Sequence, residues 1–543
     1  MTSELDLGYA VSVSMDGPAV NWKFYDKLQT NIGDEFAGRQ LLNIGSCGLH
    51  TLHNAFKSCF SGWSLDKVLS SLYHLFKKAP ARREDFLAIN PNAKFPSKFC
   101  GNRWLENQPA VERALEIWPQ VENFVKAVRD RKVNRPSCAS FDVVKGACSD
   151  PLISAKFNFF LSMSMIFTPF LTKYQCDKPM IAFLATDLYE LMRSILLRVV
   201  DREKMSALTS PSTLISFELS EDNLVDYPAV DVGFVTDDII KDLVKKRKGG
   251  ISDRQAMEFR MECRKGVVAL LTKMMKKCPL RYELVNALSF LDPRKLGESD
   301  TVDKLSVVMR RMLHAKQLSS ATCEKAKQQF QRFLDAGLDE TFSGFDPEND
   351  RLDTFYASRL SGKKEFEQLW HAVRIMLLLS HGQASVERGF SVNKELLKEN
   401  QAEETVVACR VVYDAVNDHG GVTEVPLTDE MMAYVKGSRQ KYRQALEAKQ
   451  KKDQDDEKKK KRESCDDEVK ALRKRTKLIE KVIDDFEEKA DELLKSAEGK
   501  GHQQMALKLA EALALKDKRK EKQKHLAEMN SLLETKEQEL KNM

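Results

Sequence analysis

The spacing of hydrophobic and polar positions changes twice along the chain. Residues 10–15 (AVSVSM) alternate apolar and polar side chains, and residues 40–44 (QLLNI) form a short apolar run. Each run ends at a turn that contains glycine. Runs of this kind, closed by a turn, are typical of β-strands. The sequence therefore predicts two strands in the N-terminal part of the chain.

Beyond these runs the spacing becomes that of amphipathic helices. Leu49, Leu52 and Phe56 recur every three or four positions, which places them on one face of a helix. The same pattern continues through most of the chain up to about residue 400. We therefore expect residues 131–340 to form an all-helical insertion, and a further apolar helix to follow at residues 355–379.

The last part of the chain, residues 431–543, has a composition of its own. It contains no proline and is rich in Lys, Glu, Asp, Ala and Leu, which is typical of a long helix or a coiled coil. A break at residues 499–501 predicts either an antiparallel helical hairpin or a coiled coil with a partner through residues 466–542. Apolar side chains recur there at heptad spacing, namely Leu472, Ile479, Phe486 and Leu493, with Val469, Thr476, Ile483, Ala490 and Ala497 in companion positions.

The composition restricts the class of protein. A chain of 543 residues is too long for one ordinary core, and 42% hydrophobic residues exclude a wholly disordered chain. The 11 cysteines include no CxxC pair, and no signal peptide precedes them, which indicates free thiols in a reducing compartment. The most apolar stretch, residues 157–171, is too short to span a bilayer, so we expect no membrane association.

A basic run (KKKKR) lies between Lys458 and Arg462. Such a run can act as a nuclear localisation signal or bind a polyanion, and it equally fits the solvated face of a charged helix. Acidic residues flank it on both sides, and the net charge of the chain is only +6. The run indicates the nucleus, with the cytoplasm as the alternative, and argues against an extended DNA-binding stripe.

Two short segments near the predicted strands contain candidate chemical groups. Asp16 follows the first strand, where a carboxylate can hold a metal ion, although an Asp before Gly-Pro is also a common turn residue. Cys47 and His50 lie one helical turn apart, but no second pair completes a zinc site. We expect the pair to support the strand that carries Asp16.

Two further candidates lie far apart in the chain. Arg103 precedes Trp104, and this combination suits a phosphate contact beside a stacked base, or a buried Trp next to an ion-paired Arg. Glu387 lies at the apolar edge of a predicted helix, where a solvated surface Glu is the ordinary interpretation. Neither candidate identifies a function by itself.

Taken together, these segments resemble the hAT superfamily of DNA transposases over about residues 10–420. The segment SVERGFS (residues 385–391) resembles the C-terminal signature of that family, in which the Glu is the last catalytic carboxylate. The other pieces follow in the family's order. They are Asp16 in MDGPAVN, Cys47 and His50 in CGLH, Arg103 with Trp104, and LDPR at residues 291–294.

The resemblance implies a function for each motif. It assigns Asp16 and Glu387 as two of three carboxylates that would hold a pair of Mg²⁺ ions for DNA cleavage and strand transfer. It places Cys47, His50, Arg103, Trp104 and Arg388 in contact with nucleic acid or in support of the site. It also implies a ribonuclease H-like core, and a homodimer formed through the C-terminal region, including the apolar helix that ends near Leu379.

The chain departs from the family at its beginning. Asp16 lies on the first predicted strand, so the upstream strand with the remaining carboxylate has no counterpart, and neither has the family's zinc finger. We therefore expect a transposase-derived protein that keeps the fold and dimerises, possesses no strand-transfer activity, and has DNA as a candidate partner. The alternatives are an active transposase whose N-terminus is missing from this sequence, or an unrelated helical scaffold with a coiled-coil tail.

The expected fold class is α+β and mostly α, with an incomplete ribonuclease H-like core interrupted by the helical insertion. The predicted domains are the N-terminal part of the core (1–130), the insertion (131–340), the C-terminal part of the core with the dimerisation region (341–430), and the charged tail (431–543). If this organisation is right, the carboxylates of Asp16 and Glu387 lie within about 10 Å of each other.

Overall fold

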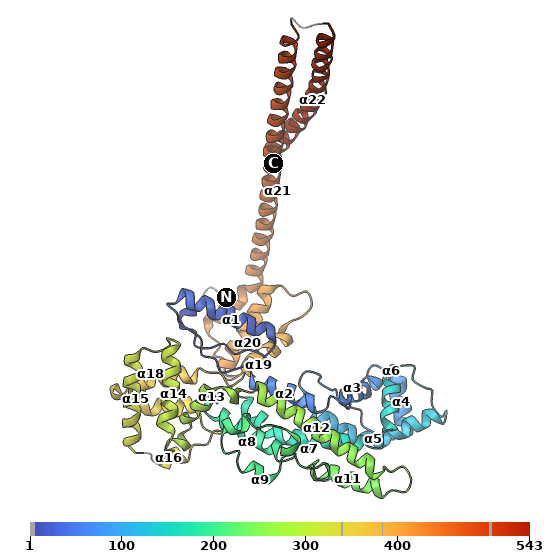
Figure 1. Ribbon diagram of the computed structural model, residues 1–543, viewed down its shortest axis with the longest axis vertical. Helices are drawn as coiled ribbons and strands as arrows, with labels where there is room; N and C mark the ends of the chain where they lie inside the picture. The colour runs from blue at the N-terminus through green and yellow to red at the C-terminus, as the bar shows by residue number, and fades with distance from the viewer. Residues whose placement is uncertain (1–5, 338–339, 383, 499–501, 543) are drawn as a thin grey trace. The chain divides into compact units, whose positions relative to one another are not determined.

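The computed structural model describes residues 6–337, 340–382, 384–498 and 502–542. Within these ranges the chain is mostly α-helical, and no β-strand is assigned (Figure 1). It divides into two compact units, Met1–Gln401 and Ala402–Met543, each of which is described by itself. No described helix is both long and apolar enough to cross a membrane. No disulfide bond is formed among the residues that the structure describes.

The two predicted strands are extended segments rather than strands. The Leu42 amide donates to the Val11 carbonyl at 2.8 Å, and the Cys47 amide donates to the Met15 carbonyl at 2.9 Å, so the two segments run parallel. Two hydrogen bonds at this separation are too few for a β-ladder, which explains why the α+β prediction does not hold for the described residues. Helix α1 (Ala19–Glu35) joins the segments and buries Ile32 against them.

Helix α2 (Gly48–Cys59) lies at the centre of the first unit. Its residue Phe56 is fully buried and contacts the ring of Phe160 on α7 at 5.0 Å between centroids. Helix α12 packs across α2 at Gly266, where a Cβ atom would lie 2.3 Å from the carbonyl oxygen of Cys59. The absence of a side chain at Gly266 therefore lets the two helix backbones approach each other closely.

The first unit contains many further helices, and α12 and the turn η3 are those that pack most extensively on α2. The longer ones are α3 (Leu65–Phe76), α4 (Pro80–Ile89), α5 (Gln108–Arg129), α6 (Ala139–Cys148), α7 (Ile153–Tyr174), α8 (Ile181–Leu196), α11 (Phe234–Lys245), α12 (Asp253–Lys277), α14 (Thr301–His314), α15 (Ser320–Asp335), α17 (Leu352–Leu360), α18 (Glu367–Leu377) and α19 (Ala384–Leu396). Shorter pieces are α9 (Arg202–Met205), α10 (Pro211–Ile215), α13 (Glu283–Ala287), α16 (Glu340–Ser343), and the 3-10 turns η2 (Leu7–Tyr9), η3 (Trp104–Asn107), η4 (Glu221–Asn223), η5 (Tyr227–Ala229), η6 (Pro279–Arg281), η7 (Leu288–Leu291), η8 (Pro293–Lys295) and η9 (Lys364–Phe366).

One hydrophobic core runs through the first unit from Leu42 to Leu379. Between residues 131 and 337 the only β pairing is an isolated bridge between Val200 and Leu224. Helices of this stretch pack directly on the N-terminal part, as α12 does on α2 and α6 does on α3. The helical stretch and the N-terminal part therefore share a core, and we expect them to unfold together.

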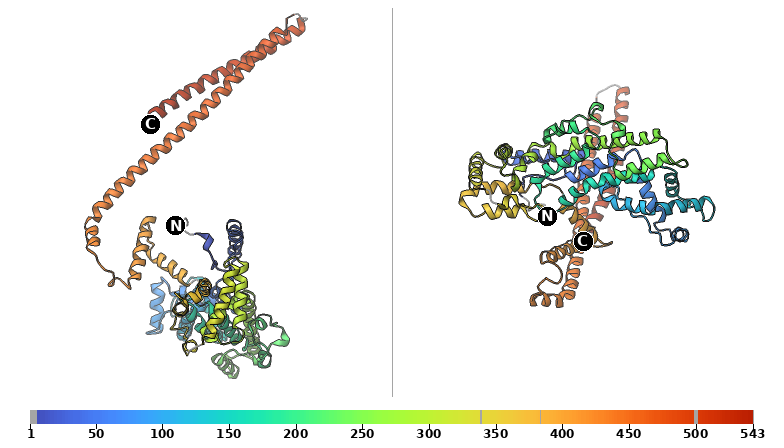
Figure 2. Two further views of the ribbon diagram at one scale, coloured as in Figure 1. Left: turned by 90° about the vertical axis from the view of Figure 1, so that its left-hand side faces the viewer. Right: turned by 90° about the horizontal axis from the view of Figure 1, so that it is seen from below.

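The second unit contains α20 (Glu403–Asp418) and two long antiparallel helices, α21 (Asp429–Lys495) and α22 (His502–Asn542) (Figure 2). Arg473 pairs with Glu537 at 2.7 Å, and Arg519 pairs with Glu487 at 2.8 Å. Of the two predicted tail arrangements, the structure has the hairpin. The predicted break at residues 499–501 lies outside the described residues. One heptad column is buried between the helices, namely Val469, Thr476, Ile483, Ala490 and Ala497.

Candidate functional site

Asp16 and Glu387 meet at one imidazole, although they lie near opposite ends of the first unit's sequence. His50, in the first turn of α2, places Nδ1 2.9 Å from Asp16 Oδ1 and Nε2 3.5 Å from Glu387 Oε1. Asp16 follows the first extended segment, and Glu387 belongs to α19. Because one carbon atom separates the two ring nitrogens, the carboxylates are near neighbours, as the sequence predicted.

The protonation of His50 depends on its surroundings. A side-chain hydrogen bond with Cys47 is the largest cause that raises the pKa of His50, and the charges of Asp16 and Glu387 act in the same direction. Partial burial opposes them. Asp16 Oδ1 and His50 Nδ1 are buried atoms that lie within ion-pair distance but not in hydrogen-bond geometry. Their attraction is therefore mainly electrostatic.

Arg103 occupies the other side of the Glu387 carboxylate. Its guanidinium pairs with Glu387 Oε2 and also donates to Glu106 Oε1 at 3.1 Å. Both oxygens of Glu387 thus face a side chain that can carry positive charge, the imidazole of His50 when it is protonated at one and the guanidinium of Arg103 at the other. The sequence did not single out Glu106. Its position three residues after Arg103, on the same turn, is the signal that could have identified it.

His53 supports the pocket from within the core. Burial, followed by the nearby charges of His50 and Arg103, lowers the pKa of His53 to about 4. The neutral ring accepts a hydrogen bond at Nδ1 from the Leu105 amide, at 3.3 Å. This bond ties α2 to η3, which begins directly after Arg103. His53 therefore helps to hold the guanidinium beside Glu387.

Trp104 is a core residue and not a base-stacking surface. It is 3% exposed, lies parallel to Phe60 with an interplanar angle of 12°, and contacts the edge of Phe99. Of the two interpretations given for Trp104, its buried position fits support of the site and not contact with a stacked base. The alternative reading, a buried Trp beside an ion-paired Arg, describes the structure.

Arg388 and the LDPR segment have structural partners. Arg388 pairs with Asp177, which follows α7. In LDPR, the nearly buried Asp292 accepts two hydrogen bonds from the Arg294 guanidinium, at 2.9 and 2.7 Å, and caps η8. The segment forms a turn in the core and lines neither cavity described here. The side chain of Ser385 lies outside the described residues.

The cavity beside this cluster measures about 220 Å³. Its arrangement does not fit the two-metal site that the resemblance implies. Asp16 and Glu387 are separated by the His50 ring, and Glu387 already faces Arg103. No group of three or more His, Cys, Asp or Glu side chains suited to a metal ion occurs among the described residues. A Mg²⁺ ion would have to displace two cationic side chains from Glu387.

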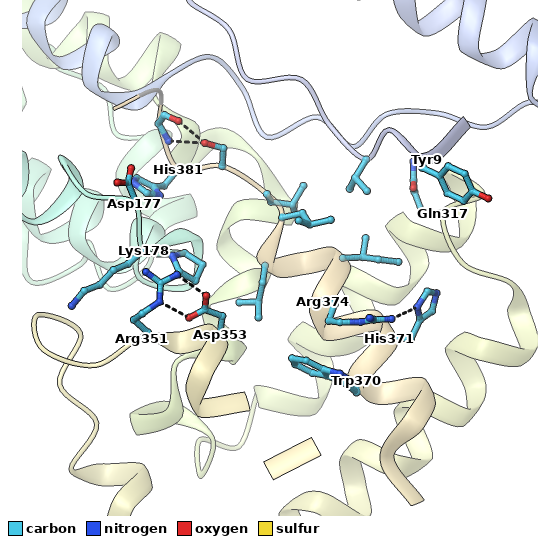
Figure 3. Close-up of a pocket in the computed structure, with 18 of the residues that line it drawn as sticks. Tyr9, Asp177, Lys178, Gln317, Arg351, Asp353, Trp370, His371, Arg374 and His381 are labelled. Carbon is cyan, nitrogen blue, oxygen red and sulfur yellow. Dashed lines mark hydrogen bonds and ion pairs between the residues drawn. The ribbon is translucent and has the colours of Figure 1, made fainter. Parts of the chain in front are cut away.

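A larger cavity of about 960 Å³ lies between the N-terminal segment and α18 (Figure 3). The sequence predicted none of it. Gln317 is its clearest polar element, because it is buried and donates to the carbonyls of Ala10 and Gln40 at 3.2 and 2.6 Å. These contacts join Gln317 to residues that lie 307 and 277 positions earlier in the sequence. No local sequence pattern indicates them.

Comparison with known proteins adds no identification. Neither a family model nor a curated protein sequence matches the chain. The resemblance to hAT transposases therefore rests on the motif residues, their order and the pocket in which Asp16, His50, Arg103 and Glu387 meet.

Proposed function

We propose that the chain is a transposase-derived protein that keeps a hAT-like fold, forms a homodimer, and neither cleaves nor joins DNA. The observation that carries the proposal is the meeting of Asp16, His50, Arg103 and Glu387 in one side-chain cluster. These residues come from the four sequence segments that carry the resemblance. An unrelated helical scaffold gives no reason for them to converge.

The proposed fold is the remnant of a ribonuclease H-like core. Its support is the pair of parallel extended segments, which are joined through α1 and hydrogen-bonded from Val11 to Leu42 and from Met15 to Cys47. A helix that connects two parallel strands is the repeating unit of such cores. Here the pairing is reduced to two hydrogen bonds, in keeping with the loss of neighbouring strands.

The proposed lack of catalysis follows from charge. Two-metal transfer needs carboxylates on both sides of an ion pair. The cluster offers Asp16 and Glu387, while Glu106, another acid that lines the cavity, accepts a hydrogen bond from Arg103. Arg103 and the protonated form of His50 compensate the charges of Asp16 and Glu387. A divalent ion would have to break these contacts and would gain fewer ligands than it needs, so the pocket favours its own ion pairs over a metal.

Dimerisation is proposed to occur through the exposed apolar side chains of α20. This helix has no buried residue, and its Val411 and Val412 are each 62% exposed. Apolar surface of this extent is typical of an interface. By contrast, α18 buries its apolar side chains in the core of its own chain, so the expectation that this helix carries the dimer is revised.

DNA is proposed as a partner through the basic run from Lys458 to Arg462. The run is fully exposed on α21, and Lys461 forms an ion pair with Glu457 at 3.1 Å. Such a contact is electrostatic and independent of base sequence, so its affinity must fall steeply as salt rises. A mobility-shift titration of duplex DNA at several salt concentrations, with Lys458–Lys460 changed to Gln as the comparison, tests this part alone.

The central experiment combines an activity assay with a sizing measurement on the full chain. With Mg²⁺ or Mn²⁺ and candidate terminal-repeat DNA, we expect no cleavage or joining, and Glu387→Gln and the exposed control Glu395→Gln should both behave like the parent chain. Light scattering should give a dimer, which Val411→Glu disrupts and Val422→Glu does not. Cleavage that Glu387→Gln abolishes would instead overturn the proposal and show that another residue supplies the missing carboxylate.

A further inference from the structure

The large cavity beside α18 has a floor of apolar side chains and a rim of charged ones. Ile375 is nearly buried, whereas Leu378 is 66% exposed and lines the same cavity. Figure 3 shows Lys178, Arg351 and Asp353 on one side of the cavity, and Trp370 and Arg374 on the other. We call this cavity the α18 groove. Its floor suits apolar groups, and its rim suits charged ones.

The charges on the rim do not balance. Both acids of the groove are already paired, Asp353 with Arg351 at 2.6 Å and Asp177 with Arg388. Arg39 and Arg374 also line the groove, and neither has a carboxylate partner among the residues that the structure describes. The groove therefore presents two uncompensated guanidinium groups, which carboxylates bind in bidentate geometry.

Arg39 is held in place for such a contact. Its terminal nitrogen donates to Gln317 Oε1 at 2.6 Å, while Gln317 is itself fixed by the carbonyls of Ala10 and Gln40. The Nε atom of Arg39 is buried and has no hydrogen-bond partner among the described residues. A buried donor without an acceptor costs stability, so an acceptor that enters the groove would relieve that cost.

The first extended segment, whose residue Val11 lines the groove, is also incompletely bonded in its backbone. The first extended segment uses the carbonyls of Val11 and Met15 for its neighbour, which leaves Ser12 and Ser14 facing away from it. Neither Ser12 nor Ser14 forms a backbone hydrogen bond with any described residue, and both are half-buried. An extended segment with free amide and carbonyl groups is a template for another extended chain.

We propose that the α18 groove binds an extended segment of a partner protein in which apolar and acidic residues alternate. The apolar side chains pack on Ile375 and Leu378, the carboxylates pair with Arg39 and Arg374, and the backbone pairs with the edge at Ser12 and Ser14. The inference does not depend on the ancestry or the activity of the chain.

The composition of the floor favours a peptide over single-stranded nucleic acid. Nucleic-acid grooves combine positive charge with several aromatic rings on which successive bases stack. Here the floor is aliphatic, with Ile375, Leu377, Leu378 and Leu379, and the aromatic side chains of the lining, Tyr9, Trp370, His371 and His381, lie beside that floor and do not form it. Aliphatic side chains next to free backbone groups match an extended peptide, in which both features recur along the chain.

The test is fluorescence anisotropy with the full chain and a labelled octapeptide of alternating leucine and aspartate. We expect saturable binding that the leucine–lysine counterpart does not show. Arg39→Gln combined with Arg374→Gln should weaken binding by about tenfold or more, because charge-assisted hydrogen bonds are lost. The control Arg310→Gln, an exposed Arg on α14, should leave the affinity unchanged.

A second variant tests the floor without disturbing the core. Leu378→Glu places a carboxylate on the exposed part of the floor and should abolish binding of the acidic peptide. Met165→Glu, which alters a residue of similar exposure on α7, should not. Equal binding by all variants, binding of the lysine peptide alone, or preferential binding of single-stranded DNA that the arginine variants abolish would each overturn the proposal.

Discussion

The two cavities of the first unit differ in how their charges are matched. Beside the small one, His50 and Arg103 face the carboxylate of Glu387, His50 also faces Asp16, and a ligand must break these contacts to reach Glu387. In the α18 groove the acids are already paired, and two arginines are left without carboxylates. Residues that resemble a catalytic site can thus pair with one another and leave no charge for a ligand. Residues outside any motif can form a site whose charges are available to a ligand.

The largest expected effect is on the free energy of unfolding, and it comes from truncating Trp104, which supports the small cavity. Trp104→Ala should destabilise the chain by about 3–5 kcal/mol, because the side chain is fully packed against Phe60 and Phe99. Urea unfolding followed by circular dichroism measures the change. Trp22→Ala, at a half-buried position on α1, is the control and should cost less. Equal losses would mean that Trp104 has no special part in the core.

The residues of the small site could be predicted from sequence because they lie in short, distinctive sequence motifs. Asp16 before Gly-Pro, Cys47 with His50, and Glu387 within SVERGFS are each recognisable locally, and the resemblance supplied their order. The resemblance could not predict which side chains of the site pair with one another. Pairing of Arg103 with Glu387 depends on how η3 and α19 pack, which no spacing rule encodes.

The two predicted strands and the α18 groove show what sequence patterns cannot predict. The alternation at residues 10–15 and the apolar run at residues 40–44 predicted strands, but the structure has extended segments there that are not strands. A strand also needs neighbours to complete its hydrogen bonds, and these come from tertiary structure. The groove has no local signal at all. Gln317 and Arg39 are ordinary polar residues in sequence, and only their contact across the fold makes them part of a site.

The next effect tests whether the small cavity is held by its ion pair. A double-mutant cycle with Arg103→Met and Glu387→Gln should give a coupling of about 1 kcal/mol, since both side chains are partly exposed and screened by solvent. The exposed pair of Arg135 and Asp142 is the matched control and should couple more weakly. Coupling should fall as salt is added. A cycle that closes to zero would show that the contact contributes nothing.

A smaller effect concerns pH, and the two neighbouring histidines should behave oppositely. The pKa of His50 is raised above its ordinary value near 6.5, so its contribution to stability is complete below that pH and is lost as pH rises through the folded pKa. The pKa of His53 is lowered to about 4, so it disfavours the folded state as pH falls below about 6.5 and reaches its full cost near 4.

Nuclear magnetic resonance titration of the imidazole protons separates the two. Glu387→Gln should move the His50 midpoint to lower pH, because it removes a negative charge that stabilises the imidazolium, as does Asp16→Asn from the opposite nitrogen. His53 should still titrate well below His50, since burial is the main cause of its low pKa. Two histidines that titrate together near their ordinary value would contradict the cluster.

The smallest effect is expected in the α18 groove, and it is the most direct test of the contrast between the cavities. Arg374 is exposed and has no carboxylate partner among the described residues, so Arg374→Gln should change the free energy of unfolding by less than about 0.5 kcal/mol. Arg264→Gln is the contrasting variant. Arg264 is 7% exposed in its side chain, pairs with Glu221 and donates to the Val225 carbonyl at 2.9 Å, and its loss should cost about 1–3 kcal/mol. If Arg374→Gln were as costly as Arg264→Gln in urea unfolding, the groove arginine would be a structural residue, and its charge would not be available to a ligand.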